Sequence, residues 1–167
     1  MMLLIVGCLI ISLQALSLTN INTEPMRQAL ALAAQAAAAG EVPVGAIIMR
    51  GGRVIASAAN AMRSGTDPTA HAEIIAIRAA ALVLGSQRLT GCDLWVTLEP
   101  CAMCAGAISH ARFDRLYYAA SDAKGGGVEH GARIFSHDTC HHAPEIYSGI
   151  CEAEAKAQLQ AFFSERR

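Results

Sequence analysis

The sequence feature that most constrains the fold is a short apolar run that stops abruptly and passes straight into a helix-forming segment. Residues 94–98 form a compact β run, Pro100 breaks it, and residues 101–110 are small and favour a helix. The same alternation recurs, with helices expected at 26–39, 69–84 and 148–167 and strands at 42–49, 54–58 and 115–120. Thr69 is the expected N-cap of the second helix and Gly85 its stop, and Phe162 and Phe163 are expected apolar contacts of the last helix. Helices alternating with strands predict an α/β domain in which helices cover both faces of a sheet.

Length and composition bound the class of protein. The chain has 167 residues, of which 53% are hydrophobic and 16% charged, so we expect a single globular domain rather than a disordered chain. The chain has 13 Lys and Arg and 14 Asp and Glu, which gives a net charge of −1. Because the protein then has no overall positive field to attract a polyanion, binding to such a partner would need local basic patches. Six cysteines are too few for a disulfide-dense scaffold.

The N-terminal segment differs from the rest of the chain. Residues 1–23 carry no charged side chain, and residues 3–18 are almost entirely apolar. This run of about sixteen residues is shorter than the roughly twenty that cross a bilayer, and no basic residue precedes Arg27, as a secretory signal would require. Two interpretations stay open, a start codon placed upstream of Met26 or a weak membrane anchor. We therefore separate residues 1–23 from a domain at residues 24–167.

Cys101 and Cys104 lie three residues apart at an expected helix start. Free backbone N–H groups and the positive end of the helix dipole favour thiolates there, and thiolates are zinc ligands. A redox-active pair also follows a strand and opens a helix, so the pair alone is ambiguous. A zinc ribbon would need a second closely spaced pair, which the other cysteines do not form: Cys8, Cys92, Cys140 and Cys151.

His71 favours a metal site over a redox pair. It too is expected in the first turn of a helix, so its imidazole can meet the two sulfurs if both helices begin at the same edge of the sheet. One histidine and two cysteines leave the fourth tetrahedral position for water, which is typical of a catalytic zinc site, whereas a structural site is closed by four protein ligands. We predict that His71, Cys101 and Cys104 bind zinc.

Glu73 is the predicted proton carrier. In a first turn its carboxylate can reach past the helix end toward the same metal as His71, where it can take a proton from water and return it to a leaving group. Its alternative role is to complement the helix dipole or to cap the helix. Glu99 is the rival carboxylate, but it lies before Pro100 where the strand ends.

Several segments together resemble the bacterial tRNA-specific adenosine deaminases, a family of zinc deaminases. They are Asn60 and residues 41–46, 67–74, 96–108 and 122–124, which include the His71-Ala72-Glu73 and Pro100-Cys101-x-x-Cys104 motifs. The resemblance covers about residues 25–167. It implies a cytidine-deaminase-like fold, three layers of helix, sheet and helix with a five-stranded mixed sheet, and a homodimer. It also implies hydrolytic conversion of adenosine to inosine at the wobble position of a tRNA anticodon, with release of ammonia.

The resemblance also assigns residue roles. One zinc ion per subunit would be held by the three ligands, and Glu73 would move the protons. Asn60 would hydrogen-bond the flipped-out base, and Asp122 would lie in the loop along the anticodon strand. From the residues alone, each of these two could instead stabilise its own turn.

Other groups bear on the RNA partner. Phosphate contacts would come from scattered basic residues: Arg112, Lys124, Arg133, Arg166 and Arg167. His141 and His142 fall near the RNA-binding surface of the family, and without partner cysteines we expect surface groups rather than a second metal site. Residues 124–131, with four glycines, are expected to form a flexible loop.

Two alternative functions remain. A free nucleobase or nucleoside deaminase of the guanine or cytosine type would use the same zinc ligands, and a non-catalytic zinc or redox module would not need Glu73. We expect the enzyme in the cytoplasm, where tRNA is found, with no membrane partner.

Overall fold

The computed structural model describes residues 22–166, so the interpretation of residues 1–23 lies almost wholly outside it and stays a prediction. Five strands form one mixed sheet in the order β2 (Arg53–Ala59), β1 (Gly45–Arg50), β3 (Cys92–Leu98), β4 (Arg115–Ala120) and β5 (Glu145–Tyr147). β1 runs antiparallel to both β2 and β3, whereas β3, β4 and β5 are parallel. The five-stranded mixed sheet implied by the resemblance is confirmed.

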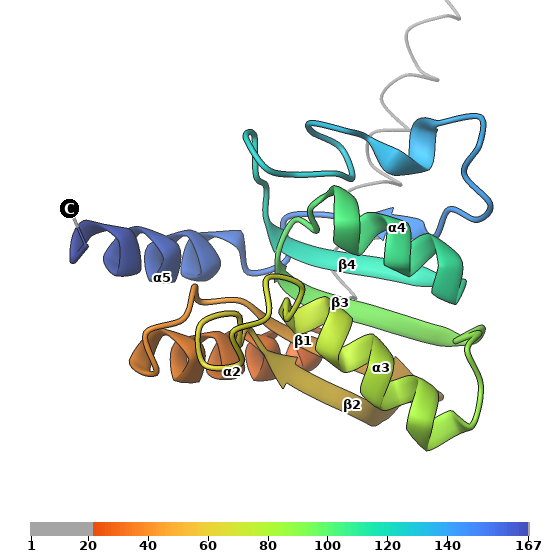
Figure 1. Ribbon diagram of the computed structural model, residues 1–167, viewed down its shortest axis with the longest axis horizontal. Coiled ribbons are helices and arrows are strands. Elements are labelled where there is room, and N and C mark those ends of the chain that lie inside the picture. Colours follow the sequence, from red (N-terminus) through yellow and green to blue (C-terminus); the bar gives the residue numbers. More distant parts are fainter. Residues whose placement is uncertain (1–21, 167) are drawn as a thin grey trace, which may run out of the picture.

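Helices cover both faces of this sheet. In Figure 1, α3 (Ala72–Leu84) and α4 (Ala102–Ala111) lie side by side on one face, while α2 (Glu24–Ala38) and α5 (Glu152–Ser164) pack on the other. Successive side chains of a strand point to opposite faces, so Ile48 joins the core under α3 and α4 whereas Ile47 packs with α2. The predicted three-layer architecture is confirmed.

The helix that we expected at residues 69–84 begins later in the structure, at Ala72. Thr69 was the predicted N-cap, but its amide and hydroxyl both bind Asp67 Oδ1, at 2.8 and 2.7 Å, in a turn that precedes the helix. His71 takes the N-cap position instead, with an extended backbone, and α3 begins at Ala72. The predicted stop at Gly85 is confirmed, because this residue adopts the left-handed conformation that glycine tolerates (φ 61°).

The C-terminal region departs most from expectation. The closing helix begins at Glu152 rather than at residue 148, because Gly149 and Cys151 have positive φ values of 81° and 59° and cannot continue a helix. Strand β5 and the short 3-10 helix η1 (Ile134–Ser136) are too short to leave a periodic pattern. Of the apolar contacts expected for the last helix, Phe162 is buried, but Phe163 is 49% exposed.

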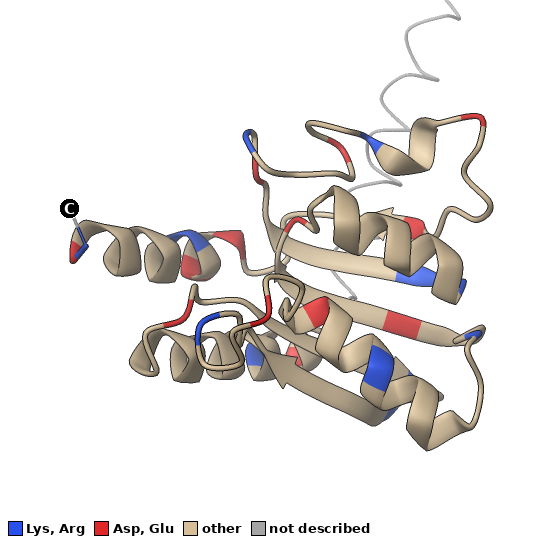
Figure 2. Ribbon diagram, in the orientation of Figure 1, with Lys and Arg blue, Asp and Glu red and all other residues tan. Residues whose placement is uncertain are grey.

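Charged side chains are interspersed over the fold rather than gathered on one side, as Figure 2 shows for the ribbon. This distribution agrees with the near-neutral net charge, so contacts with a polyanion would have to be local. Within residues 22–166, none of the helices combines the length and the apolar content that crossing a bilayer requires.

Candidate metal centre

The starts of α3 and α4 bring the three predicted zinc ligands together. His71 and Cys101 are the N-cap residues of the two helices, and Cys104 follows in the first turn of α4. His71 Nδ1 lies 3.7 Å from Cys101 Sγ and 3.4 Å from Cys104 Sγ, and the three ligand atoms all lie within 4.8 Å of one another. Zinc bonds of about 2.1 Å to nitrogen and 2.3 Å to sulfur at tetrahedral angles separate the two atoms by roughly 3.5 Å. The donor set fits zinc and leaves one position open.

Neighbouring groups stabilise the thiolate form of Cys101. The hydrogen bond from Cys104 and the contact with His71 outweigh burial and lower the pKa of Cys101 to about 4. The same thiol pair raises the pKa of Cys104, and burial raises it further. Because a thiol that coordinates a metal cation is deprotonated, and its proton is released to solvent or to a base, a bound cation would favour the thiolate form of Cys104.

Glu73 lies in the first turn of α3, beside the ligands. It is only 4% exposed, and burial raises the pKa of its carboxyl above the ordinary value. A carboxyl with a raised pKa can hold and release a proton nearer to neutral pH than an exposed glutamate can, which suits a general acid–base group.

All the predicted site residues except the fully buried Cys104 line one cavity of about 180 Å³. Its walls are Val42, Val44, Asn60, Met62, His71, Glu73, Leu98, Glu99, Cys101, Asp122 and Gly125. Asn60 follows β2 and is buried; its backbone amide donates to the Val44 carbonyl at 3.0 Å, but its side chain makes no hydrogen bond within residues 22–166. Asp122 does serve its own turn, since Oδ1 accepts from the amides of Lys124 and Gly125.

Comparison with known proteins agrees with this site. The family model for the cytidine and deoxycytidylate deaminase zinc-binding region matches residues 19–120, which include all three ligands and Glu73. The chain belongs to this family of zinc deaminases. Within it, the chain is 55% identical over 146 residues to the tRNA-specific adenosine deaminase of Agrobacterium fabrum, covering 87% of this chain and 96% of that one.

Two solved structures extend the comparison. One comes from a study of A-to-I editing by tRNA:A34 deaminases at the wobble position of transfer RNA; it has a TM-score of 0.81 and 55% identity, and the match covers 83% of this chain and all of that chain. The other is a guanine deaminase from Bacillus subtilis, with a TM-score of 0.58 and 44% identity over 60% of this chain and 66% of that one.

Glu99 has a role in this deaminase that the sequence did not reveal. Its buried carboxylate accepts hydrogen bonds from the backbone amides of Asp122 (3.0 Å), Val128 (3.2 Å), Glu129 (2.9 Å) and His130 (2.9 Å), and lies 2.7 Å from His130 Nδ1. Burial raises its pKa, but these hydrogen bonds outweigh burial and lower the pKa overall. The loop expected at residues 124–131 is present, and Glu99 binds Asp122 just before it and residues 128–130 within it; its flexibility stays a prediction.

A second buried carboxylate holds the opposite side of the cavity. Glu41 Oε1 accepts from the backbone amides of Arg63 and Ser64, at 2.9 and 2.8 Å, in the loop that follows Asn60. Burial raises the pKa of Glu41, but these hydrogen bonds lower it below its ordinary value overall. Glu41 lies more than twenty residues from its partners, so neither loop contact could be inferred from local sequence.

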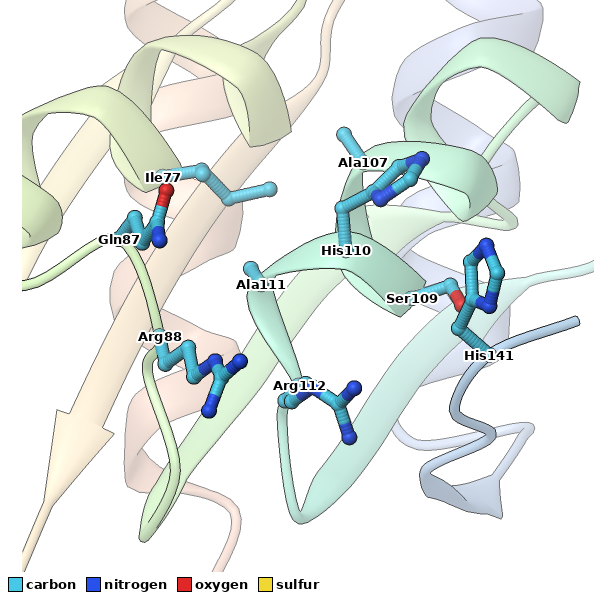
Figure 3. A pocket seen from close by; sticks show the side chains of 9 residues that line it. All are labelled: Ile77, Gln87, Arg88, Ala107, Ser109, His110, Ala111, Arg112 and His141. Carbon is cyan, nitrogen blue, oxygen red and sulfur yellow. The ribbon is translucent and has the colours of Figure 1, made fainter.

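A larger cavity of about 670 Å³ lies between the loop after α3 and the end of α4. Figure 3 shows Arg88 on the loop after α3 and Arg112 at the end of α4, which both line this cavity, with His110 on α4 and His141 on the neighbouring loop. Among the residues that the structure describes, no carboxylate or thiol lines this cavity, so they do not supply it with the groups of the metal centre. His141 is exposed, as predicted, but His142 is half-buried and contacts the Phe113 carbonyl at 2.6 Å.

Proposed function

We propose that this deaminase converts adenosine to inosine at the wobble position of a tRNA anticodon, with water as the co-substrate and ammonia as the leaving group. One observation carries this proposal: His71 and Cys101, which lie together with Cys104, share one small cavity with Glu73 and Asn60. At about 180 Å³ the cavity is smaller than the roughly 300–1,000 Å³ typical of pockets for drug-sized ligands, and it suits a single base.

His71, Cys101 and Cys104 hold one zinc ion per subunit. When bound, zinc with three protein ligands acts as a Lewis acid that activates water. Glu73 accepts one proton of the attacking water and delivers it to the adenine ring nitrogen as the bond from C6 to oxygen forms. It then takes the remaining proton of the new hydroxyl group and delivers it to the amino group as the bond from C6 to that nitrogen breaks. Both protons of water are thus accounted for, and adenosine and water give inosine and ammonia. The raised pKa of Glu73 supports both proton transfers.

Asn60 and Asp122 bind the substrate on either side of the reacting base. The side-chain amide of Asn60 makes no hydrogen bond within the described part of the chain, and it hydrogen-bonds the edge of the flipped-out base. Asp122 faces the strand that enters the cavity. A base in an anticodon loop is already unpaired, which saves the few kcal/mol that extracting it from a duplex costs.

Basic residues away from the cavity contact the RNA backbone. Arg112 ends α4, and ten helical residues span about 15 Å, so the cavity shared with Arg88 lies within reach of a stem whose loop enters the metal centre. Two arginines without a carboxylate between them suit phosphate oxygens.

We also propose that the enzyme is a cytoplasmic homodimer. Leu82 and Val83, at the end of α3, are 84% and 65% exposed, and a second copy would cover this apolar surface. The molar mass of the purified protein, measured by light scattering, tests the dimer.

The reaction is tested with zinc-loaded protein and three kinds of substrate: an anticodon stem-loop, the same sequence in a duplex, and free guanine, cytosine and adenosine. We expect inosine from the stem-loop alone, and none with Glu73→Gln. The likeness to a guanine deaminase favours free bases as a second candidate. Deamination of a free base without activity on RNA would support that candidate, and equal rates on loop and duplex would contradict ours.

A further inference from the structure

One wall of the cavity depends on a single carboxylate. Residues 122–130 contribute Asp122 and Gly125 to the cavity, yet this segment belongs to no helix or regular strand. Glu99 Oε2 receives the amide of Asp122 at one end and contacts His130 Nδ1 at the other, while Oε1 receives the three consecutive amides of residues 128–130. Both ends of the wall are therefore tied to one side chain.

The close packing of two glycines shows that the wall has little room to move. A Cβ atom on Gly126 would lie 2.6 Å from Glu99 Cδ, and one on Gly127 would lie 2.5 Å from the backbone nitrogen of Ala102. The Gly127 amide also donates to the Pro100 carbonyl at 2.8 Å. The segment thus lies directly against the start of α4, which carries the cysteine ligands.

A further contact connects residues 122–130 to strand β4. The buried Tyr118 on β4 donates its hydroxyl to the Glu129 side chain. The carboxylate of Glu99 receives five N–H contacts, whereas a carboxylate offers about four lone-pair sites. No lone pair of the Glu99 carboxylate is left to take a proton from water or substrate, because residues 122–130 occupy all of its acceptor sites.

We propose that Glu99, together with His130, is a positioning residue for polymeric substrate: it fixes residues 122–130 as the wall along which the RNA strand enters. This inference rests on the proposed function, because it concerns how the same site recognises RNA. A free nucleoside fills only the inner cavity beside Asn60 and Glu73, whereas the flanking nucleotides pass the wall at Asp122. Glu99 therefore governs the KM for RNA and leaves the chemical step to Glu73.

The first experiment separates KM from kcat on the anticodon stem-loop. In Glu99→Gln an amide N–H replaces one acceptor oxygen, so donors are left unpaired, and we expect KM to rise about tenfold while kcat changes by less than about threefold. Glu152→Gln, which breaks an exposed ion pair with Lys156, is the matched control and should leave KM unchanged. A fall in kcat at constant KM in Glu99→Gln, with zinc retained, would overturn the proposal and indicate that Glu99 takes part in proton transfer.

The second experiment uses His130 and does not alter the buried carboxylate. His130→Ala removes the Nδ1 contact and should raise KM, whereas His130→Asn places an amide N–H near the position of Nδ1 and should restore it. Equal KM values for wild type and His130→Ala would overturn the role of His130. This pair keeps the proposal testable if Glu99→Gln does not fold.

A third measurement does not depend on activity. In the zinc-loaded protein, hydrogen exchange at the amides of residues 128–130 should be faster in Glu99→Gln than in wild type or Glu152→Gln. Unchanged exchange there would overturn the positioning role. If wild type makes no inosine from RNA but Glu99→Gln still speeds this exchange, the proposed function fails while the hold of Glu99 on the wall stands.

Discussion

The two helix starts and the two loops around the cavity are built in different ways. The starts of α3 and α4 carry the proposed zinc ligands and Glu73 within four residues of a helix N-terminus, so local structure places these groups at the helix ends. The loops at residues 60–68 and 122–130 are instead held by Glu41 and Glu99, which lie 22 to 31 residues from the amides that they bind. Chemistry is thus encoded locally, whereas the walls that receive substrate depend on distant contacts.

The two loops also differ from each other. Glu99 binds its loop at both ends and is saturated, whereas Glu41 binds two neighbouring amides through one oxygen. We therefore expect changes at the helix starts to abolish the reaction, changes at residues 122–130 to alter substrate binding, and changes at Glu41 to lower the stability of the fold modestly without a direct effect on the reaction.

The largest effect is expected at a helix start, from Cys101→Ser. A neutral hydroxyl is a poor substitute for a thiolate, so zinc and activity should be lost together. Cys151→Ser is the matched control, because Cys151 lies at the start of α5 on the other face of the sheet and should leave the zinc content unchanged. Full zinc occupancy in Cys101→Ser, measured by elemental analysis, would contradict the ligand assignment.

Glu73→Gln is expected to separate metal binding from proton transfer. An amide keeps the shape of the side chain but cannot shuttle protons, so zinc and the fold should persist while kcat falls by about 10²–10⁴-fold. Single-turnover kinetics on a stem-loop measure this loss. A variant that retains a tenth of the rate would show that another group carries the proton.

Gly127→Ala probes the wall against the start of α4. The added Cβ would approach the Ala102 nitrogen to 2.5 Å, so the segment must move, and we expect a loss of about 1–3 kcal/mol in the free energy of unfolding together with a higher KM for RNA. Gly106→Ala, inside α4 with no neighbouring atom within 4 Å of its Cβ, should stabilise the protein by about 0.5–1 kcal/mol. Similar urea denaturation midpoints for the two variants would contradict the packing argument.

The smallest effect is expected for Glu41→Gln, and it should depend on pH. Because the folded-state pKa of Glu41 is lowered, its charge stabilises the fold above the unfolded-state pKa, and this contribution is lost as the pH falls through the folded-state pKa. Above about pH 5 the variant should lose about 1 kcal/mol, and near pH 3, which is below the unfolded-state pKa of about 4.3, the difference should be smaller. Urea denaturation at both pH values measures the difference, and a constant difference would refute the electrostatic origin.

Local signals in the sequence determined the elements that carry the chemistry. Pro100 ends one apolar run and Gly85 ends one helix, and the structure has both boundaries where these residues predicted them. The spacing of Cys101 and Cys104 at a helix start predicted two ligands, because residues in one helical turn share an end of the helix. The fifth strand came from family resemblance alone, since three residues carry no period.

Only the tertiary structure decided what these elements meet. His71 and the cysteine sulfurs approach within 3.4–3.7 Å because α3 and α4 pack side by side on one face of the sheet, a placement that depends on strand order. The role of Glu99 was equally hidden, since any of the exposed amides along the chain could in principle have bound its carboxylate. Helix and strand boundaries follow from the conformational preferences of adjacent residues, whereas the burial of Glu73 and the partners of Glu99 arise when segments distant in sequence pack together.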